Sequence, residues 1–91
     1  MTHVAREVTI CNARGLHARA AAKFVEMAQG FDATIHVSRD GETVNADSIM
    51  ELLMLAAAKG SVIGIVSEGP DAKTAADSLC DLVEAGFHED V

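Results

Sequence analysis

Large aromatic side chains are nearly absent from this 91-residue sequence, which has no tryptophan, no tyrosine and three phenylalanines. We therefore expect a core built from Ala, Val, Ile, Leu and Met. The scarcity of rings argues against binding single-stranded nucleic acid, which stacks its bases on aromatic side chains. The net charge of −7 argues the same way, because nucleic-acid surfaces are basic.

Long apolar runs are also missing. No segment approaches the roughly 18 consecutive apolar residues of a membrane span, so we expect no membrane insertion. Residues 1–7 show no apolar run typical of a signal peptide. The two cysteines, Cys11 and Cys80, have no metal-ligand or redox spacing. We interpret both as small apolar residues, expect neither metal nor cofactor, and expect a cytoplasmic protein.

The remaining composition, with 49% hydrophobic and 23% charged residues, is that of a globular protein. The length suits a single domain covering residues 1–91. Charge is unevenly distributed: acidic residues are absent from 8–25, where Arg14, Arg19 and Lys23 occur. A basic segment in an acidic protein is a candidate anion site, although three charges can also cluster by chance.

Hydrophobic periodicity predicts the order β-α-β-β-α-β-α. The expected strands are residues 7–11, 33–38, 43–45 and 62–67, and the expected helices are 18–29, one from Ser48 to Lys59-Gly60, and one from Asp71 to Gly86. Asp40-Gly41 predicts a hairpin turn, Ser48 and Glu51 have capping-box spacing, and Asp71 is the expected cap of the third helix. This order predicts an α+β two-layer sandwich, one antiparallel sheet covered on one face by helices.

The segment Gly15-Leu16-His17-Ala18-Arg19 places a histidine where a turn becomes a helix. The first N–H groups of a helix have no internal partner and its dipole makes that end partly positive, so a phosphoryl group finds donors there. A neutral histidine nitrogen is a nucleophile that can accept and release such a group. Arg19 is close enough to offset its charge. From these residues alone, a histidine that caps the helix beside an unrelated arginine is an open alternative.

The residues Asn12-Ala13-Arg14-Gly15-Leu16-His17-Ala18-Arg19 resemble the signature of the HPr family, the histidine-containing phosphocarriers of the bacterial phosphoenolpyruvate-dependent phosphotransferase system. The resemblance covers essentially the whole chain, including Ser48-Ile49-Met50 and the turn at Gly69. It implies an open-faced two-layer β-sandwich of four antiparallel strands with three helices on one face. It also implies a phosphoryl carrier rather than an enzyme.

By this resemblance, His17 accepts phosphate from enzyme I on Nδ1 and donates it to a IIA domain, while Ala18 and Arg19 bind the phosphoryl group. The pathway is either sugar uptake or nitrogen-related regulation, and the sequence leaves both open. Ser48 has two compatible roles. By resemblance it is the regulatory site of an HPr kinase/phosphorylase, and by its spacing from Glu51 it is a helix cap.

Two positions depart from the pattern of the family. Ala20 stands where proline usually follows the arginine, and Asp47 stands where many relatives carry a basic residue. Proline presets the first helical turn, so we expect a slightly less rigid start of the first helix. The acidic Asp47 lies directly before Ser48 and weakens the case for a regulatory serine there.

The second helix is apolar on nearly every side, and a two-layer domain cannot bury every side of a helix. Its apolar residues, together with Leu16, are therefore either core or a docking patch for protein partners: Ile49, Met50, Leu53 and Met54. Methionine suits a surface that accepts several partners. We expect the carrier to be a monomer.

Two further functions stay open at this point. A regulatory binding domain could use the same fold without chemistry, although the presence of His17 favours a carrier. A ferredoxin-like metal chaperone shares a mixed β/α order but needs a cysteine pair in a loop, which the sequence lacks.

Overall fold

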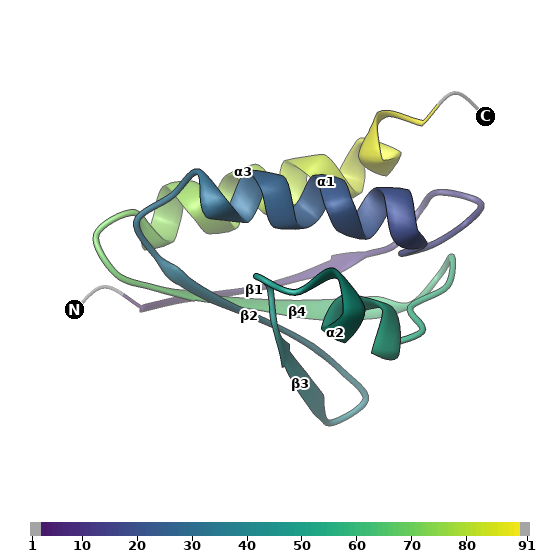
Figure 1. Ribbon diagram of the computed structural model, residues 1–91, viewed down its shortest axis with the longest axis horizontal. Coiled ribbons are helices and arrows are strands. Elements are labelled where there is room, and N and C mark those ends of the chain that lie inside the picture. Colours follow the sequence, from purple (N-terminus) through teal and green to yellow (C-terminus); the bar gives the residue numbers. More distant parts are fainter. Residues whose placement is uncertain (1–2, 90–91) are drawn as a thin grey trace.

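The computed structural model describes residues 3–89, which form a four-stranded sheet packed against helices (Figure 1). In chain order the elements are β1 (His3–Thr9), α1 (Ala18–Gln29), β2 (Thr34–Arg39), β3 (Glu42–Asn45), α2 (Ile49–Met54), β4 (Val62–Glu68), α3 (Ala72–Glu84) and a 3₁₀ turn, η1 (Gly86–His88). The predicted order and the helix over 18–29 are confirmed. Within residues 3–89, no helix has the length and apolar character to cross a membrane.

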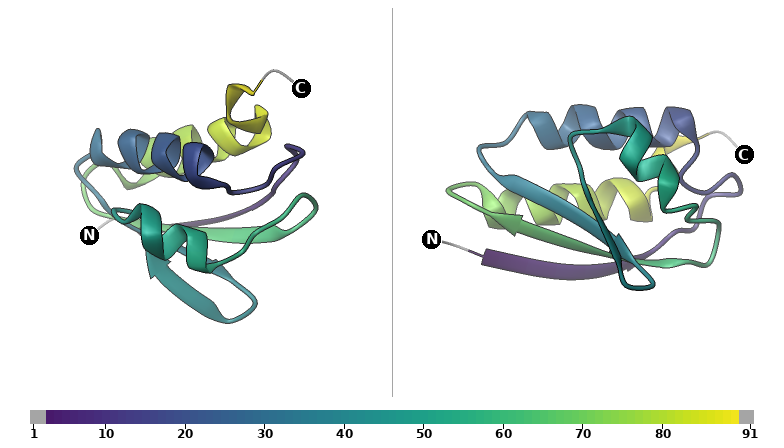
Figure 2. Two further views of the ribbon diagram at one scale, coloured as in Figure 1. Left: turned by 45° about the vertical axis from the view of Figure 1, so that its right-hand side comes forward. Right: turned by 60° about the horizontal axis from the view of Figure 1, so that its bottom comes forward.

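The sheet is antiparallel throughout, with the strand order β1-β4-β2-β3. In the strand β4, Ile65 lies opposite Arg6 on one side and Val37 on the other. α1 and α3 lie side by side over one face of this sheet, and α2 packs against α1 beside β3 (Figure 2). The opposite face is open: Ile63 and Ile65 are completely buried, whereas Val62 is 51% exposed. The predicted α+β two-layer arrangement is confirmed.

The first strand begins earlier than predicted. Every residue from His3 to Thr9 pairs with β4, whereas the alternation of side chains indicated a strand only from Glu7. Residues His3–Glu7 are not buried, so no apolar pattern marks them, and their strand conformation comes from pairing with a distant segment. The other three strands lie within one residue of their predicted bounds.

The second helix ends at Met54, not near Lys59 as predicted. The backbone of Ala56 has a φ of 51°, in the left-handed region where a helix cannot continue. The carbonyl oxygen of Leu55 accepts a hydrogen bond from Nη1 of Arg39 on β2 (3.0 Å). The apolar sequence after Met54 favours a further helical turn. The hydrogen bond from Arg39 takes the place of that turn.

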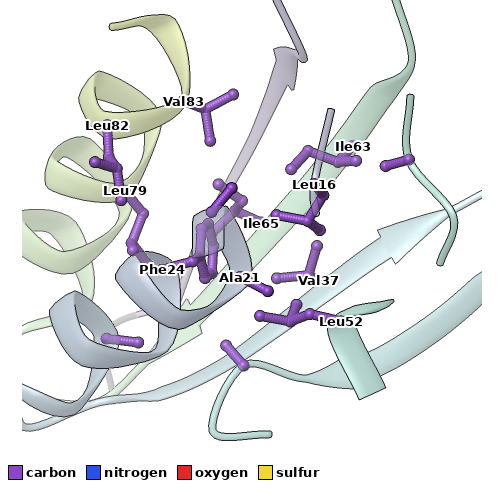
Figure 3. Packing of buried hydrophobic residues seen from close by; sticks show 14 of the residues in the cluster. Leu16, Ala21, Phe24, Val37, Leu52, Ile63, Ile65, Leu79, Leu82 and Val83 are labelled. Carbon is purple, nitrogen blue, oxygen red and sulfur yellow. The ribbon is translucent and has the colours of Figure 1, made fainter. Parts of the chain in front are cut away.

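The fully buried core consists of Ala, Val, Ile and Leu, as composition predicts, together with phenylalanine rather than methionine. Phe24 of α1 and Phe87 of η1 are completely buried, and Figure 3 shows Phe24 beside Leu79 of α3. Within residues 3–89 no methionine is fully buried, and Met50 and Met54 are 72% and 69% exposed. The expected core of Ala, Val, Ile and Leu is confirmed, but methionine within this range contributes to it only through the partly buried Met27, because the short α2 turns Met50 and Met54 to solvent. The predicted stripe of α3 is buried as expected: Ala72, Ala75, Ala76, Leu79 and Val83.

The caps of α2 and α3 differ in kind. Oγ of Ser48 accepts a hydrogen bond from the N–H of Glu51 (3.2 Å), which confirms that Ser48 caps α2. Glu51 does not reciprocate, since its side chain accepts from the N–H of Asn45. Asp71 is the N-cap residue of α3, as predicted, but its side chain makes no cap hydrogen bond to the helix. Its carboxylate accepts from the N–H of Asp32 (2.8 Å) and so links two loops instead of capping the helix.

The turn before α1 is held against the loop after α2 by a close backbone contact. The N–H of Leu16 donates to the carbonyl oxygen of Ala57 (2.8 Å). A Cβ added at Gly15 would lie 2.5 Å from that same oxygen and 2.8 Å from Cα of Ala58. Gly15 also has a φ of +65°, a conformation in which other residues are strained. Position 15 therefore requires glycine. The hydrogen bond between Leu16 and Ala57 fixes the position of the neighbouring His17.

We expect Gly15→Ala to lower the free energy of unfolding by clearly more than 1 kcal/mol, measured by urea denaturation. Placing a side chain in the left-handed region costs about 1 kcal/mol, and the backbone collision adds to it. Gly41→Ala is the matched control, because Gly41 has a φ of +85° with no atom within 4 Å of the added Cβ. Equal losses in the two variants would show that the close approach at Gly15 does not constrain the fold.

Candidate functional site

His17 is the N-cap residue of α1. Its backbone is extended (φ −76°, ψ 177°), and its carbonyl oxygen accepts the N–H of Ala21 (2.8 Å). Its side chain makes no cap hydrogen bond to the helix and is 21% exposed. The alternative that this histidine serves as a side-chain cap is therefore wrong. The imidazole is free to face other groups, next to the unpaired N–H groups of the first helical turn.

The ring of His17 meets a carboxylate from the far end of the sequence. Nε2 of His17 contacts Oε1 of Glu89. Nδ2 of Asn12 donates to both carboxylate oxygens of Glu89 (3.3 Å each) and to the carbonyl oxygen of Gly15 (2.8 Å). In Figure 1 the segment after α3 lies at the same end of the molecule as the start of α1.

The environment of Glu89 favours its ionised form. The hydrogen bond with His17 lowers the pKa of the Glu89 carboxyl below its usual value, and the Asn12 amide and the positive charge of Arg14 act in the same direction, against the opposing effect of desolvation. Glu89 is therefore a carboxylate at neutral pH and can only accept hydrogen bonds.

The basic residues that cluster in the sequence also gather in space. Arg14, Arg19 and Lys23 line one hollow with Ala13, His17, His88 and Glu89. Nζ of Lys23 donates to the carbonyl oxygen of Phe87 (2.7 Å). Within residues 3–89, neither Arg14 nor Arg19 has an ion-pair partner. Two unpaired guanidinium groups beside a helix start form a surface that can receive an anion.

The predicted docking residues fall into two groups. Ile49, Met50 and Met54 are exposed (39%, 72% and 69%), and Leu53 is half-buried against the core. These four residues form what we call the α2 patch. Leu16 is 5% exposed and belongs to the core, where Figure 3 places it beside Ile63. The expectation that Leu16 joins an exposed patch is therefore wrong, because its side chain points inward when its N–H bonds to the loop after α2.

Sequence reasoning missed two residues of the site. Glu89 lies far along the chain from His17, and no spacing rule connects them. Asn12 was noted only as part of the signature, but it is 3% exposed and holds both the turn and the carboxylate. Across the described part of the chain, no three His, Cys, Asp or Glu side chains come together to hold a metal ion.

The site thus combines a histidine at a helix start, a basic hollow around it and an exposed apolar helix nearby. A family model described as the PTS HPr component phosphorylation site matches residues 4–85. The chain is 45% identical over 89 residues to phosphocarrier protein NPr of Shewanella violacea, covering 98% of both chains. It is 44% identical over 84 residues to phosphocarrier protein HPr of Cupriavidus necator, covering 92% of this chain and 94% of the relative.

Solved structures agree with the sequence relatives. The structure of HPr from Thermoanaerobacter tengcongensis matches with a TM-score of 0.89 and 41% identity over the full length of both chains. That of HPr from Bacillus anthracis matches with a TM-score of 0.87 and 43% identity, covering 91% of this chain and 99% of the other. This chain belongs to the HPr family, the phosphohistidine carriers that relay a phosphoryl group from enzyme I to IIA proteins.

Proposed function

We propose that His17 is the residue that carries the phosphoryl group. The observation that carries this proposal is its place: His17 is the N-cap of α1 and lines the hollow that Arg14, Arg19 and Lys23 surround. His3 lies on β1 and His36 on β2, away from any helix start. His88 also lines the hollow but lies at the end of η1 rather than at the start of a helix, so it is the residue that an experiment must separate from His17.

The chemistry at His17 is a direct transfer between nitrogen nucleophiles. A ring nitrogen of His17 forms a bond to phosphorus as the N–P bond of the donor breaks and its electron pair returns to the donor ring. The N–H of Ala18 and the neighbouring first-turn amides are the donors for the phosphoryl oxygens. The exposed guanidinium of Arg19 offsets the added charge of about −1.5 to −2.

The test is phosphorylation by enzyme I with phosphoenolpyruvate, followed by mapping of the acid-labile label. We expect label on His17 alone, none on His17→Ala, and full labelling of the control His88→Ala. Arg19→Ala should melt within a few degrees of wild type, since Arg19 is exposed. Its transfer should slow by roughly tenfold, equivalent to about 1.4 kcal/mol. Label retained by His17→Ala would contradict the proposal.

We infer that the α2 patch is the docking surface for both the phosphoryl donor and the acceptor. The patch lies on the helix that packs against α1, and Met50 and Met54 are its most exposed large apolar side chains. One surface for two partners suits a carrier, because the same histidine must face each of them in turn.

Met50→Glu should weaken transfer from enzyme I and transfer to the IIA acceptor together, while the melting temperature stays near that of wild type. Val62→Glu is the matched control, since Val62 is a half-exposed apolar residue on β4, outside the patch. A Met50→Glu variant that transfers normally in both directions would contradict docking on α2. So would an equal loss of transfer in Val62→Glu.

We further propose that Ser48 is a regulatory phosphorylation site for an HPr kinase/phosphorylase, acting by charge rather than by unfolding. Its hydroxyl caps α2 and adjoins the α2 patch. A phosphate at a helix N-terminus is favoured by the dipole and the free N–H groups, so α2 should hold. A docking partner, however, would have to bury a dianion beside apolar side chains, which is costly.

Ser48→Asp should keep the fold and slow the phosphorylation of His17 by enzyme I. Ser48→Ala should cost about 1 kcal/mol of unfolding free energy through the lost cap, with transfer nearly intact. Urea denaturation and transfer rates measured on both variants separate the two roles. Normal transfer by the aspartate variant would exclude a regulatory role for Ser48.

We propose a cytoplasmic monomer as the working form, which suits a carrier that must leave one protein partner to meet the next. Similarity to NPr supports the nitrogen-related branch of the system, and similarity to HPr supports the sugar branch. Comparing phosphorylation rates with the enzyme I of each branch identifies the pathway that this carrier serves.

A further inference from the structure

Glu89 is placed against His17 by an anchored segment of the chain. Phe87 is completely buried in the core, and its carbonyl oxygen accepts the hydrogen bond from Nζ of Lys23. Gly86 and Phe87 both have positive φ values, 64° and 56°, and this turn lies against α1 through the Lys23 contact. With Phe87 fixed, the side chain two residues further on reaches the imidazole.

The carboxylate of Glu89 is also held from its second side. Both of its oxygens accept from Nδ2 of Asn12, whose amide is itself buried and tied to the carbonyl oxygen of Gly15. The acceptor therefore meets the ring in a defined orientation. Of these three residues, Asn12 and His17 belong to the family signature and only Glu89 lies outside it.

The proton arrangement follows from elementary chemistry. An ionised carboxylate has no hydrogen to donate, so the contact with Oε1 of Glu89 requires a hydrogen on Nε2 of His17. A neutral imidazole carries one N–H, so Nδ1 is left with its lone pair. The lowered pKa of Glu89 keeps the carboxylate ionised at neutral pH.

We propose that Glu89 is a positioning residue for phosphoryl transfer, which holds His17 as the Nε2–H tautomer and directs the Nδ1 lone pair to the incoming phosphorus. This inference rests on the proposed role of His17. In serine hydrolases, a carboxylate orients a catalytic imidazole and stabilises the cation that forms during the reaction. In His17 the carboxylate of Glu89 contacts Nε2, whereas the proposed nucleophile is Nδ1. The carboxylate therefore does not occupy the position of the incoming phosphorus.

Glu89 also supplies a counter-charge during the transfer. As Nδ1 of His17 bonds to phosphorus, the N–P bond of the donor phosphohistidine breaks and its electron pair returns to the donor ring. The His17 ring, with Nε2–H retained, becomes cationic, and the carboxylate of Glu89 offsets that positive charge. When the phosphoryl group leaves for the acceptor, the pair returns to Nδ1 and the ring is neutral again. No proton has to leave the ring in either direction.

Glu89→Gln is the decisive variant because it preserves size. An amide can accept from Nε2–H or donate to an unprotonated Nε2, so it no longer selects one tautomer. In ¹⁵N-labelled protein, at a pH where the ring is neutral, NMR should show the single Nε2–H tautomer in wild type and both tautomers in Glu89→Gln and Glu89→Ala. Transfer from phosphorylated enzyme I should slow by roughly ten- to hundredfold, by analogy with the loss on removing carboxylates that orient metal-binding histidines.

Glu42→Gln is the matched control, since it makes the same substitution at an exposed position on β3, and it should keep the wild-type tautomer and rate. A single unchanged tautomer in Glu89→Gln, or transfer at or above the wild-type rate, would overturn the proposal; faster transfer would identify Glu89 as a block on the site. If wild type accepts no phosphoryl group on His17, the proposed function fails, while the tautomer spectra still decide whether Glu89 orients the ring.

Discussion

The hydrogen bond from the N–H of Leu16 to the carbonyl oxygen of Ala57 ties together the two parts of the molecule that the carrier needs. On one side of this bond stands His17 at the start of α1, and on the other stands the loop that follows the exposed helix α2. Gly15 makes the approach possible because no side chain fits between the two backbones. Arg39 fixes the same loop from the sheet through the carbonyl oxygen of Leu55. The His17 ring and the α2 patch therefore keep a fixed relation to each other, as the proposed docking of one partner against both requires.

Most of the fold could be predicted because its signals are local. The alternation of Ile35 and Val37, the turn at Asp40-Gly41 and the apolar spacing of α1 each lie within a few residues. Predictions failed where a distant segment decides the outcome. α2 stops at Met54 because its next turn is replaced by contacts from β2 and the turn before α1. Asp71 leaves its helix uncapped because the N–H of Asp32 competes for its carboxylate.

The same division applies to the site. His17 and Arg19 are two residues apart, so a local pattern, read together with the family signature, predicts both from the sequence. Glu89 reaches His17 only because Phe87 inserts into the core and the chain reverses after Gly86. A phenylalanine in an acidic tail carries no sign of that anchoring, and the carboxylate itself looks like any other charge in this segment. Long-range placement of this kind becomes visible only in three dimensions.

The strand order also determines how this chain can assemble. β4 lies between β1 and β2, so residues near the N-terminus find their sheet partner only in the final third of the chain, as when His3 pairs with Glu68. During synthesis on the ribosome, the β2–β3 hairpin is the one strand pair complete before β4 emerges, and an isolated hairpin is marginally stable in water. Contacts between such distant segments slow folding relative to a helical bundle of similar size. The apolar surfaces of β1 and β2 that pair and pack with β4 thus stay incomplete until residues 62–68 are available, and partly folded chains of this kind are prone to misassembly.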